Sequence, residues 1–237
     1  AGTISSTPVY IRLKGDIAAT TYSGDVVLTS TSATTVNVPT ATSTVDPATL
    51  TITANDASRA YGAADPTFTT TPTGFVNGDT ASIITTQATA TSNATVTSPV
   101  GNSYIIMPIG AVLSSSNYTI AYVNGTLTIT ALTDASLADL TISEVTLTPV
   151  FATGTTSYTA TVANAVTSLT VTPTTTDATA TIMVNGTAIN SGSISDPINL
   201  LVGPNTITVV VTAQDGTTQE TYTVTVTRTA ASTIVTT

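Results

Sequence analysis

The residues that most often carry out enzymatic chemistry are scarce in this chain. The sequence contains no histidine, no cysteine and no tryptophan, and its only glutamates are Glu144 and Glu220. Without histidine, the common Ser-His-Asp and Cys-His pairs cannot be assembled. A pair of carboxylates can hydrolyse a glycosidic bond, but these two glutamates lie in strand-turn contexts with no aromatic platform beside them. We therefore expect no enzymatic activity and no catalytic residue.

Four aspartates near the expected module junctions are the candidate metal ligands. Calcium sites need several oxygen ligands that converge at fixed spacing, and Asp46, Asp56, Asp134 and Asp139 could contribute to one. The sequence has no Asp-x-Asp pair and no EF-hand loop, so the competing interpretation makes these residues turn and capping groups. Calcium is the one candidate cofactor.

A single lysine raises the question of a covalent cross-link between side chains. Such a bond requires a lysine that faces an asparagine across a core, with an acid nearby to transfer protons. Lys14 is the only lysine, Asn37 is its conceivable partner, and Asp16 or Asp25 could supply the acid. The period-two alternation of the first segment could instead place Lys14 on the outside.

The charge pattern excludes one class of partner. The net charge is −9, and Lys14, Arg12, Arg59 and Arg228 are the only cations. A nucleic-acid-binding protein needs clustered lysine and arginine to displace counterions from phosphates, so we expect no nucleic acid partner.

The apolar residues are interleaved with Thr and Ser, and no uninterrupted run approaches the length of a spanning helix. The chain is therefore not expected to span a membrane.

Composition and periodicity both predict an all-β protein. Threonine accounts for 61 of the 237 residues, and Thr, Val and Ile pack well on a pleated surface. Several segments alternate apolar residues with threonine, which puts one face of each strand in a core and the other in water: 50–53, 127–130, 169–172 and 222–227. Asn-Gly and Asp-Gly pairs between them supply the positive φ of tight hairpin turns: 77–78, 124–125, 185–186 and 215–216. At most one short helix is expected, at Asp79 to Ile84 with Asp79 as its cap.

Two breaks divide the chain into modules. Pro47 biases the preceding residue toward an extended conformation, and a second break follows the strand that ends near Thr130. We expect a partial β module at 1–46, small β domains at 47–131 and 132–228, and a tail at 229–237. Strands are expected at Val9 to Leu13, Asp25 to Ser30 and Thr35 to Val38. Three strands bury little surface and leave open edges, so other residues must complete the first module.

The middle segment contains a series of short motifs made of turn glycines, asparagines and prolines and of aromatic side chains, in the order 61–62, 65–68, 74–81, 99–101, 113–120 and 122–127. In these motifs and their order, the segment resembles the MBG-type (YGX) repeats of large bacterial surface proteins. Five of these aromatic residues are expected in the core: Tyr61, Phe68, Phe75, Tyr118 and Tyr122. The resemblance attaches no catalytic role to them.

The last segment contains a second series of short strand and turn motifs, at 137–143, 147–151, 155–158, 184–187, 203–207, 211–216 and 222–228. Through these motifs it resembles the cadherin-like β-sandwich module of bacterial extracellular proteins. The first segment is similar to the final strands of an immunoglobulin-like repeat, through 9–14, 22–25 and 36–38. These resemblances imply tandem arrays of immunoglobulin-like and β-sandwich modules in a secreted, cell-surface protein such as an adhesin.

Three functions remain open at this point. The first is a structural stalk or spacer of a surface adhesin or extracellular fibre, whose partners are neighbouring modules. The second is a self-assembling filament subunit, in which the tail 233–236 of an identical subunit adds a strand to the first segment. The third is a carbohydrate-binding module for host or surface glycans, although tryptophan is absent and the eight tyrosines are better explained as core residues.

Overall fold

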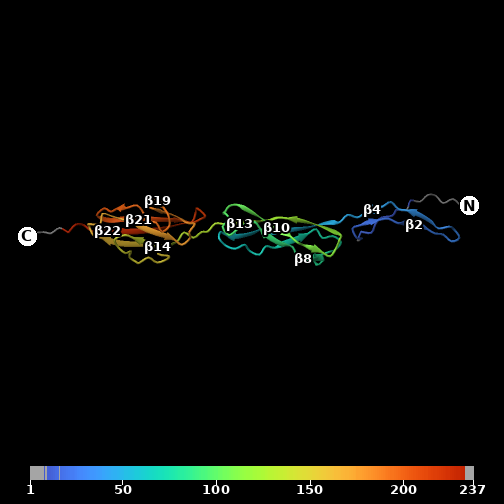
Figure 1. Ribbon diagram of the computed structural model, residues 1–237, viewed down its shortest axis with the longest axis horizontal. Coiled ribbons are helices and arrows are strands. Elements are labelled where there is room, and N and C mark those ends of the chain that lie inside the picture. Colours follow the sequence, from blue (N-terminus) through green and yellow to red (C-terminus); the bar gives the residue numbers. More distant parts are fainter. Residues whose placement is uncertain (1–7, 9, 16, 233–237) are drawn as a thin grey trace, which may run out of the picture. The chain divides into compact units, whose positions relative to one another are not determined.

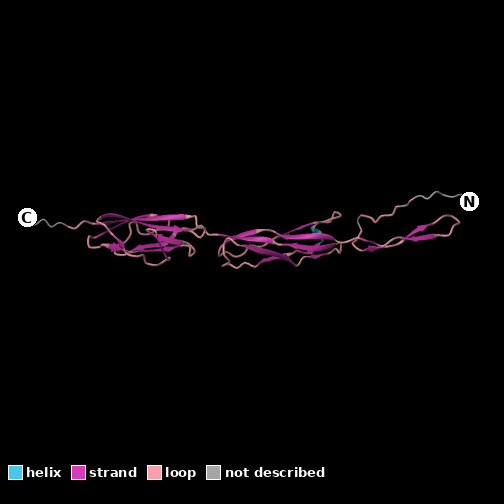
Figure 2. Cartoon of the chain, turned by 90° about the horizontal axis from the view of Figure 1, so that it is seen from above, coloured by secondary structure: helices cyan, strands magenta, loops and turns pink. Residues whose placement is uncertain are grey.

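The computed structural model describes residues 8, 10–15 and 17–232, and the fold is all-β, as expected. The chain divides into two compact units, Ala1–Thr130 and Ala131–Thr237. Apart from one short helical turn in the first unit, strands make up the regular structure that the described residues form (Figure 1 and Figure 2). No helix in the described part of the chain is long and apolar enough to cross a membrane.

The first unit begins with an open β-hairpin. Its strands pair antiparallel, β1 with β4 and β2 with β3, and their bounds are Thr21–Tyr22 (β1), Asp25–Leu28 (β2), Val36–Pro39 (β3) and Ser43–Thr44 (β4). Two of the three expected strands are thus present. The strand expected at Val9 to Leu13 is not, because residues 10–13 form no ladder; Val9 lies outside the described residues.

The rest of the first unit contains three sheets. Their strand orders are β6-β13-β10-β9, β12-β5-β7 and β11-β8. The bounds are Ala48–Ala54 (β5), Ala57–Ala60 (β6), Thr70–Thr73 (β7), Ile84–Thr86 (β8), Thr89–Ser92 (β9), Ser103–Ile109 (β10), Val112–Leu113 (β11), Tyr118–Val123 (β12) and Gly125–Thr130 (β13).

Two chain segments, one containing β5 and β6 and the other β12 and β13, run parallel to each other through two of these sheets. β12 pairs with β5 from Tyr118↔Ala48 onward, and β13 pairs with β6 from Leu127↔Ala57 onward. The register offset is the same in both pairs, so the two segments run side by side and change sheets together. The hairpin turn expected at 124–125 is therefore wrong: neither residue has a positive φ, and the strands on either side of Asn124 pair with other strands.

Two small clusters form the core of this part. Leu50, Ile84 and Tyr118 make one, with Phe75 packed against it, and Ala54, Ile106 and Leu127 make the other, with Phe68 packed against it. The expected core position is wrong for Tyr122, which is 41% exposed at the end of β12. Its phenol stays at the surface and accepts a hydrogen bond from the Ala111 N–H.

The one helical turn among the described residues is a 3₁₀ helix at Ala81–Ile83 (η1), and its cap differs from the expected one. Thr80, not Asp79, is the N-cap, and its hydroxyl accepts a hydrogen bond from the Ser82 N–H. Asp79 instead accepts a hydrogen bond from the Tyr118 phenol at 2.9 Å. Burial raises the pKa of Tyr118, and this acceptor raises it further.

The second unit is a sandwich with a five-stranded sheet, β15-β22-β21-β18-β19, and the two-stranded pairs β14-β17 and β16-β20. The bounds are Leu137–Ile142 (β14), Ser157–Val162 (β15), Ser168–Leu169 (β16), Val171–Thr175 (β17), Thr181–Val184 (β18), Thr187–Ile189 (β19), Ile198–Asn199 (β20), Gly203–Thr212 (β21) and Gln219–Arg228 (β22). Asn185 and Gly186 both have positive φ between β18 and β19, so this expected hairpin turn is confirmed.

One continuous apolar core fills the second unit. Tyr222, Val224 and Val226 of β22 are each at most 1% exposed, and they pack with Ile207, Val209 and Val211 of β21 in a single cluster. The residues between them, mostly threonine, face outward. The alternation read from the sequence is therefore the actual orientation of these strands.

Candidate functional site

Three of the four candidate calcium ligands accept a hydrogen bond from a backbone N–H. All four are exposed. Asp56 accepts a hydrogen bond from the Thr126 N–H, Asp134 from the Ser136 N–H and Asp139 from the Leu140 N–H. Within the described ranges, no three acidic, histidine or cysteine side chains gather into a potential metal site. Asp134 and Asp139 bond a backbone N–H one or two positions away, which fits the competing turn and capping interpretation, whereas Asp56 bonds a residue 70 positions along the chain.

The two glutamates have separate structural settings. Glu220 lies on β22 and accepts a hydrogen bond from the Tyr222 phenol at 2.9 Å. Burial, together with the hydrogen bond and charge of Glu220, raises the pKa of Tyr222 to about 12. Glu144 follows β14 with a φ of 71°, a left-handed conformation that non-glycine residues rarely adopt.

The residues considered for a covalent cross-link do not face one another across a core. Lys14, Asp25 and Asn37 are all exposed, whereas such a bond forms between groups enclosed by a core. Asn37 lies on β3 opposite Val27. The remaining candidate, Asp16, lies outside the described residues.

Two arginines have roles that the sequence reasoning missed. Arg59 is 7% exposed on β6, and it donates to the Asp65 carboxylate at 2.6 Å and to the Thr95 carbonyl at 2.5 Å. Arg228 donates to the carbonyl oxygens of Asn164 and Leu200. Both side chains tie loops to the ends of strands. No local pattern in the sequence pointed to Arg59, because its position is out of phase with the inward residues Leu50, Ile52 and Ala54 of the preceding strand.

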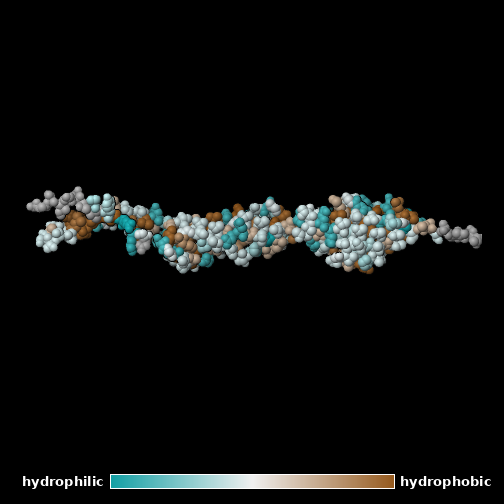
Figure 3. All heavy atoms as spheres, turned by 180° about the vertical axis from the view of Figure 1, so that it is seen from behind, coloured by the Kyte–Doolittle hydropathy of each residue, from teal (hydrophilic) through white to brown (hydrophobic). Residues whose placement is uncertain are grey.

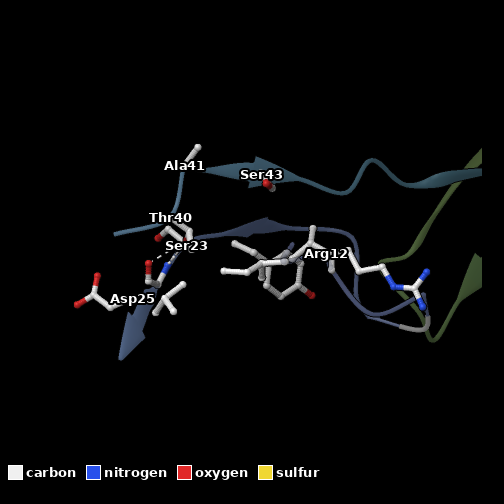
Figure 4. A pocket seen from close by; sticks show the side chains of 11 residues that line it. Arg12, Ser23, Asp25, Thr40, Ala41 and Ser43 are labelled. Carbon is white, nitrogen blue, oxygen red and sulfur yellow. Dashed lines mark hydrogen bonds between the residues drawn. The ribbon is translucent and has the colours of Figure 1, made fainter. Parts of the chain in front are cut away.

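The candidate binding site is a groove along the first hairpin, with a volume of about 500 Å³. It lies between residues 11–13 and the strands that follow, and its lining includes the apolar side chains of Ile11, Leu13, Tyr22 and Val26. Figure 4 shows Arg12 and Asp25 extending toward opposite ends of the groove. The groove therefore offers an apolar middle between one cation and one anion.

The hairpin beside this groove leaves an apolar face uncovered. Val26 pairs with Val38 and Leu28 with Val36, so these four side chains share one face. Leu28, Val36 and Val38 are each about half exposed, and Figure 3 shows hydrophobic side chains gathered over this part of the chain. A two-stranded hairpin is marginally stable on its own, and an exposed apolar patch typically marks an interaction site.

Comparisons with solved structures give low similarity. Nine chains match, and two examples are the fibronectin(III)-like modules of Clostridium thermocellum CbhA and a chimeric titin Z1Z2-Z1Z2 tandem. Each is 14% identical with a TM-score of 0.21; they cover 56% and 54% of this chain, respectively. The match spans 66% and 64% of those two chains, less than two thirds of each. No curated protein matches the sequence.

Family comparisons match the two successive β modules separately. Residues 50–128 match the MBG domain (YGX type), and residues 137–229 match the cadherin-like beta sandwich domain. Both segments are those that the sequence motifs indicated. The chain thus carries an MBG domain of the YGX type followed by a cadherin-like β-sandwich domain.

Proposed function

We propose that this chain is a load-bearing stalk segment of a secreted bacterial surface adhesin or extracellular fibre. MBG and cadherin-like domains are typical of extracellular proteins, and each unit has its own apolar core. The observation that carries the proposal is the parallel pairing of the segments that begin and end the MBG domain. This pairing determines how the domain responds to tension along the chain.

Tension enters the MBG domain at the start of β5 and leaves it at the end of β13. Because β5 and β6 pair in parallel with β12 and β13, pulling on these two ends slides the segments past each other. The slanted, evenly spaced hydrogen bonds of a parallel ladder then carry the load together instead of opening one at a time. The cadherin-like domain has a related arrangement, since β15 pairs in parallel with β22.

Single-molecule pulling tests this proposal directly. The chain has no cysteine, so pairs of introduced cysteines define the points of attachment. Handles at Asp46→Cys and Ala131→Cys load the parallel pair in shear, whereas handles at Ala63→Cys and Ala131→Cys pull its two C-terminal ends apart. We expect a severalfold higher unfolding force in the first geometry. Equal forces would contradict a load-bearing role.

A second candidate function is a filament subunit, and the uncovered apolar hairpin favours it. A strand from a second copy of this chain would cover Val26, Leu28, Val36 and Val38 and extend an open edge. The predicted donor is 233–236, which lies outside the described residues. Light scattering of the purified chain and of a variant lacking 229–237 tests this function. If the chain assembles through its tail, the parent chain should form oligomers and the shortened variant should not.

The carbohydrate-binding alternative lacks a supporting observation. Glycan-binding surfaces use exposed aromatic rings, whereas Tyr118, Tyr158 and Tyr222 are buried. Tyr10 is highly exposed, and Tyr122 is partly exposed and bonded to the backbone of Ala111. These positions do not favour glycan binding over the two structural functions.

A further inference from the structure

The outer face of the five-stranded sheet in the second unit carries a regular block of hydroxyl side chains. Three adjacent strands, β15, β22 and β21, contribute three residues each, and the register aligns them in rows. The rows are Ser157–Thr223–Thr208, Thr159–Thr225–Thr206 and Thr161–Thr227–Pro204. Only Pro204 lacks a hydroxyl group. We refer to these nine residues as the threonine block.

The geometry of a β-sheet makes this block a two-dimensional lattice. Neighbouring strands lie about 4.8 Å apart, and alternate residues of one strand lie about 6.7 Å apart. The threonines of the block therefore carry their methyl and hydroxyl groups on Cβ atoms that repeat with these spacings. The water oxygens on the prism faces of hexagonal ice repeat with similar spacings in two directions.

The hydroxyl groups at the centre of the block are available to an external ligand. Within the described part of the chain, the hydroxyl groups of Thr206, Thr223, Thr225 and Thr227 make no hydrogen bond. Thr159 and Thr208 do have partners, the Thr148 carbonyl and the Asn185 side chain. Water is therefore the natural partner of the central hydroxyls.

The chemistry of the face argues against other kinds of ligand. None of the outward-facing residues of the five described strands is charged, because Glu220 and Arg228 lie in the inward phase of β22 with Tyr222. The aromatic rings of β15 and β22 point into the core. The face thus lacks the aromatic and arginine anchors of protein interfaces and the cations that bind phosphate.

We propose that the threonine block is an ice-binding surface. The methyl groups limit the motion of the first water layer, and the hydroxyl groups hold its molecules at lattice positions. An ordered water layer of this kind matches the ice surface and joins it. This function is independent of the proposed load-bearing role, because it uses the outward side chains and not the backbone ladder.

Ice affinity and the shaping of single ice crystals in a nanolitre osmometer test the proposal. The central substitution is Thr225→Lys, which puts a long charged side chain into the middle row. The matched control is Thr141→Lys, at an exposed threonine of β14 outside the five-stranded sheet. Far-ultraviolet circular dichroism and thermal unfolding establish that both variants retain the fold.

We expect the full chain to partition into growing ice and to shape crystals, and Thr225→Lys to abolish both effects. The Thr141→Lys control should behave like the parent chain. Thr225→Val keeps the shape of the side chain and one methyl row, so it should retain part of the effect. Absence of ice shaping by the parent chain, or equal loss in both lysine variants, would overturn the proposal. Self-association through the block without ice binding would overturn it too.

Discussion

The Tyr222 phenol accepts a hydrogen bond from the Leu137 backbone N–H at 2.9 Å, linking residues that are 85 positions apart. The same phenol donates to Glu220. Through this bond the last strand of the cadherin-like domain, β22, holds the start of its first strand, β14. The Leu137 side chain is fully buried, so its N–H has no ready access to water.

Removing the phenol tests the importance of this link. Tyr222→Phe leaves the buried N–H without a partner, and we expect the second unit to lose about 1–3 kcal/mol of its free energy of unfolding. Hydrogen exchange of the full chain measures this loss separately for peptides of each unit. Tyr104→Phe is the control, because that phenol bonds the Pro99 carbonyl at an exposed site and should cost much less.

Alkaline pH should weaken the second unit through the same residue. The pKa of Tyr222 is raised from 10.0 to about 12 in the folded chain, so folding favours the protonated phenol. Its contribution to stability is complete below pH 10 and is lost as the pH rises from 10 toward 12. Thermal unfolding of the chain across this range should show a decline, and Tyr222→Phe should make the decline shallower. An identical pH dependence in the parent chain and in Tyr222→Phe would contradict the assignment of this alkaline loss of stability to Tyr222.

The buried Arg59 should be essential to the first unit. Arg59→Met leaves the Asp65 carboxylate and the Thr95 carbonyl without their donor. Breaking a buried ion pair typically costs 3–5 kcal/mol; the Asp65 side chain is 27% exposed, so we expect a loss of about 3 kcal/mol. Urea unfolding measures it. Arg12→Met, at an exposed arginine, is the matched control and should leave the midpoint of the first unit unchanged.

Gly125 is required for a steric reason. A Cβ atom at this position would lie 2.5 Å from the Ala54 carbonyl oxygen and 3.0 Å from that of Asn55, where the parallel segments change sheets. Gly125→Ala should destabilise the first unit by about 1–3 kcal/mol. Gly24→Ala serves as the control, since nothing lies within 4 Å of its Cβ position. Equal stability of the two variants in urea would show that the crossing can relax.

The apolar hairpin gives a pair of substitutions that differ only in their face. Leu28 shares the face of Val26 and the groove, whereas Val27 points to the opposite face. If a second copy covers the groove, Leu28→Lys should shift the oligomers to monomers in light scattering, and Val27→Lys should not. Equal effects of the two substitutions would argue against this docking face. A parent chain that is monomeric at every concentration would leave only the stalk function.

Local sequence pattern predicted the strands of the second unit well. Tyr222, Val224 and Val226 alternate with threonines and lie in the core as expected. The turn at Asn185 and Gly186 was also predictable, because its requirement for positive φ is a property of two adjacent residues. Both features depend on neighbours in the chain, which the sequence displays directly.

Pairing over long distances was beyond the sequence pattern. The Asn124–Gly125 pair looks like a hairpin turn, yet the strands beside it pair in parallel with β5 and β6. Alternation determines which face of a strand is buried, but it does not identify the strand beside it. For the same reason the sequence did not indicate that Arg59 meets Thr95, or that Tyr122 lies at the surface.

The sequence by itself therefore determined the all-β class, the inward and outward faces of the principal strands, and the two domain types. These follow from local periodicity, turn chemistry and motif order. Only the tertiary structure decided three features: the parallel pairing of β5 and β6 with β12 and β13 in the MBG domain, the register that aligns the threonine block, and the uncovered groove of the first hairpin. Each of these depends on which distant segments lie side by side, and that choice is made by packing over the whole unit.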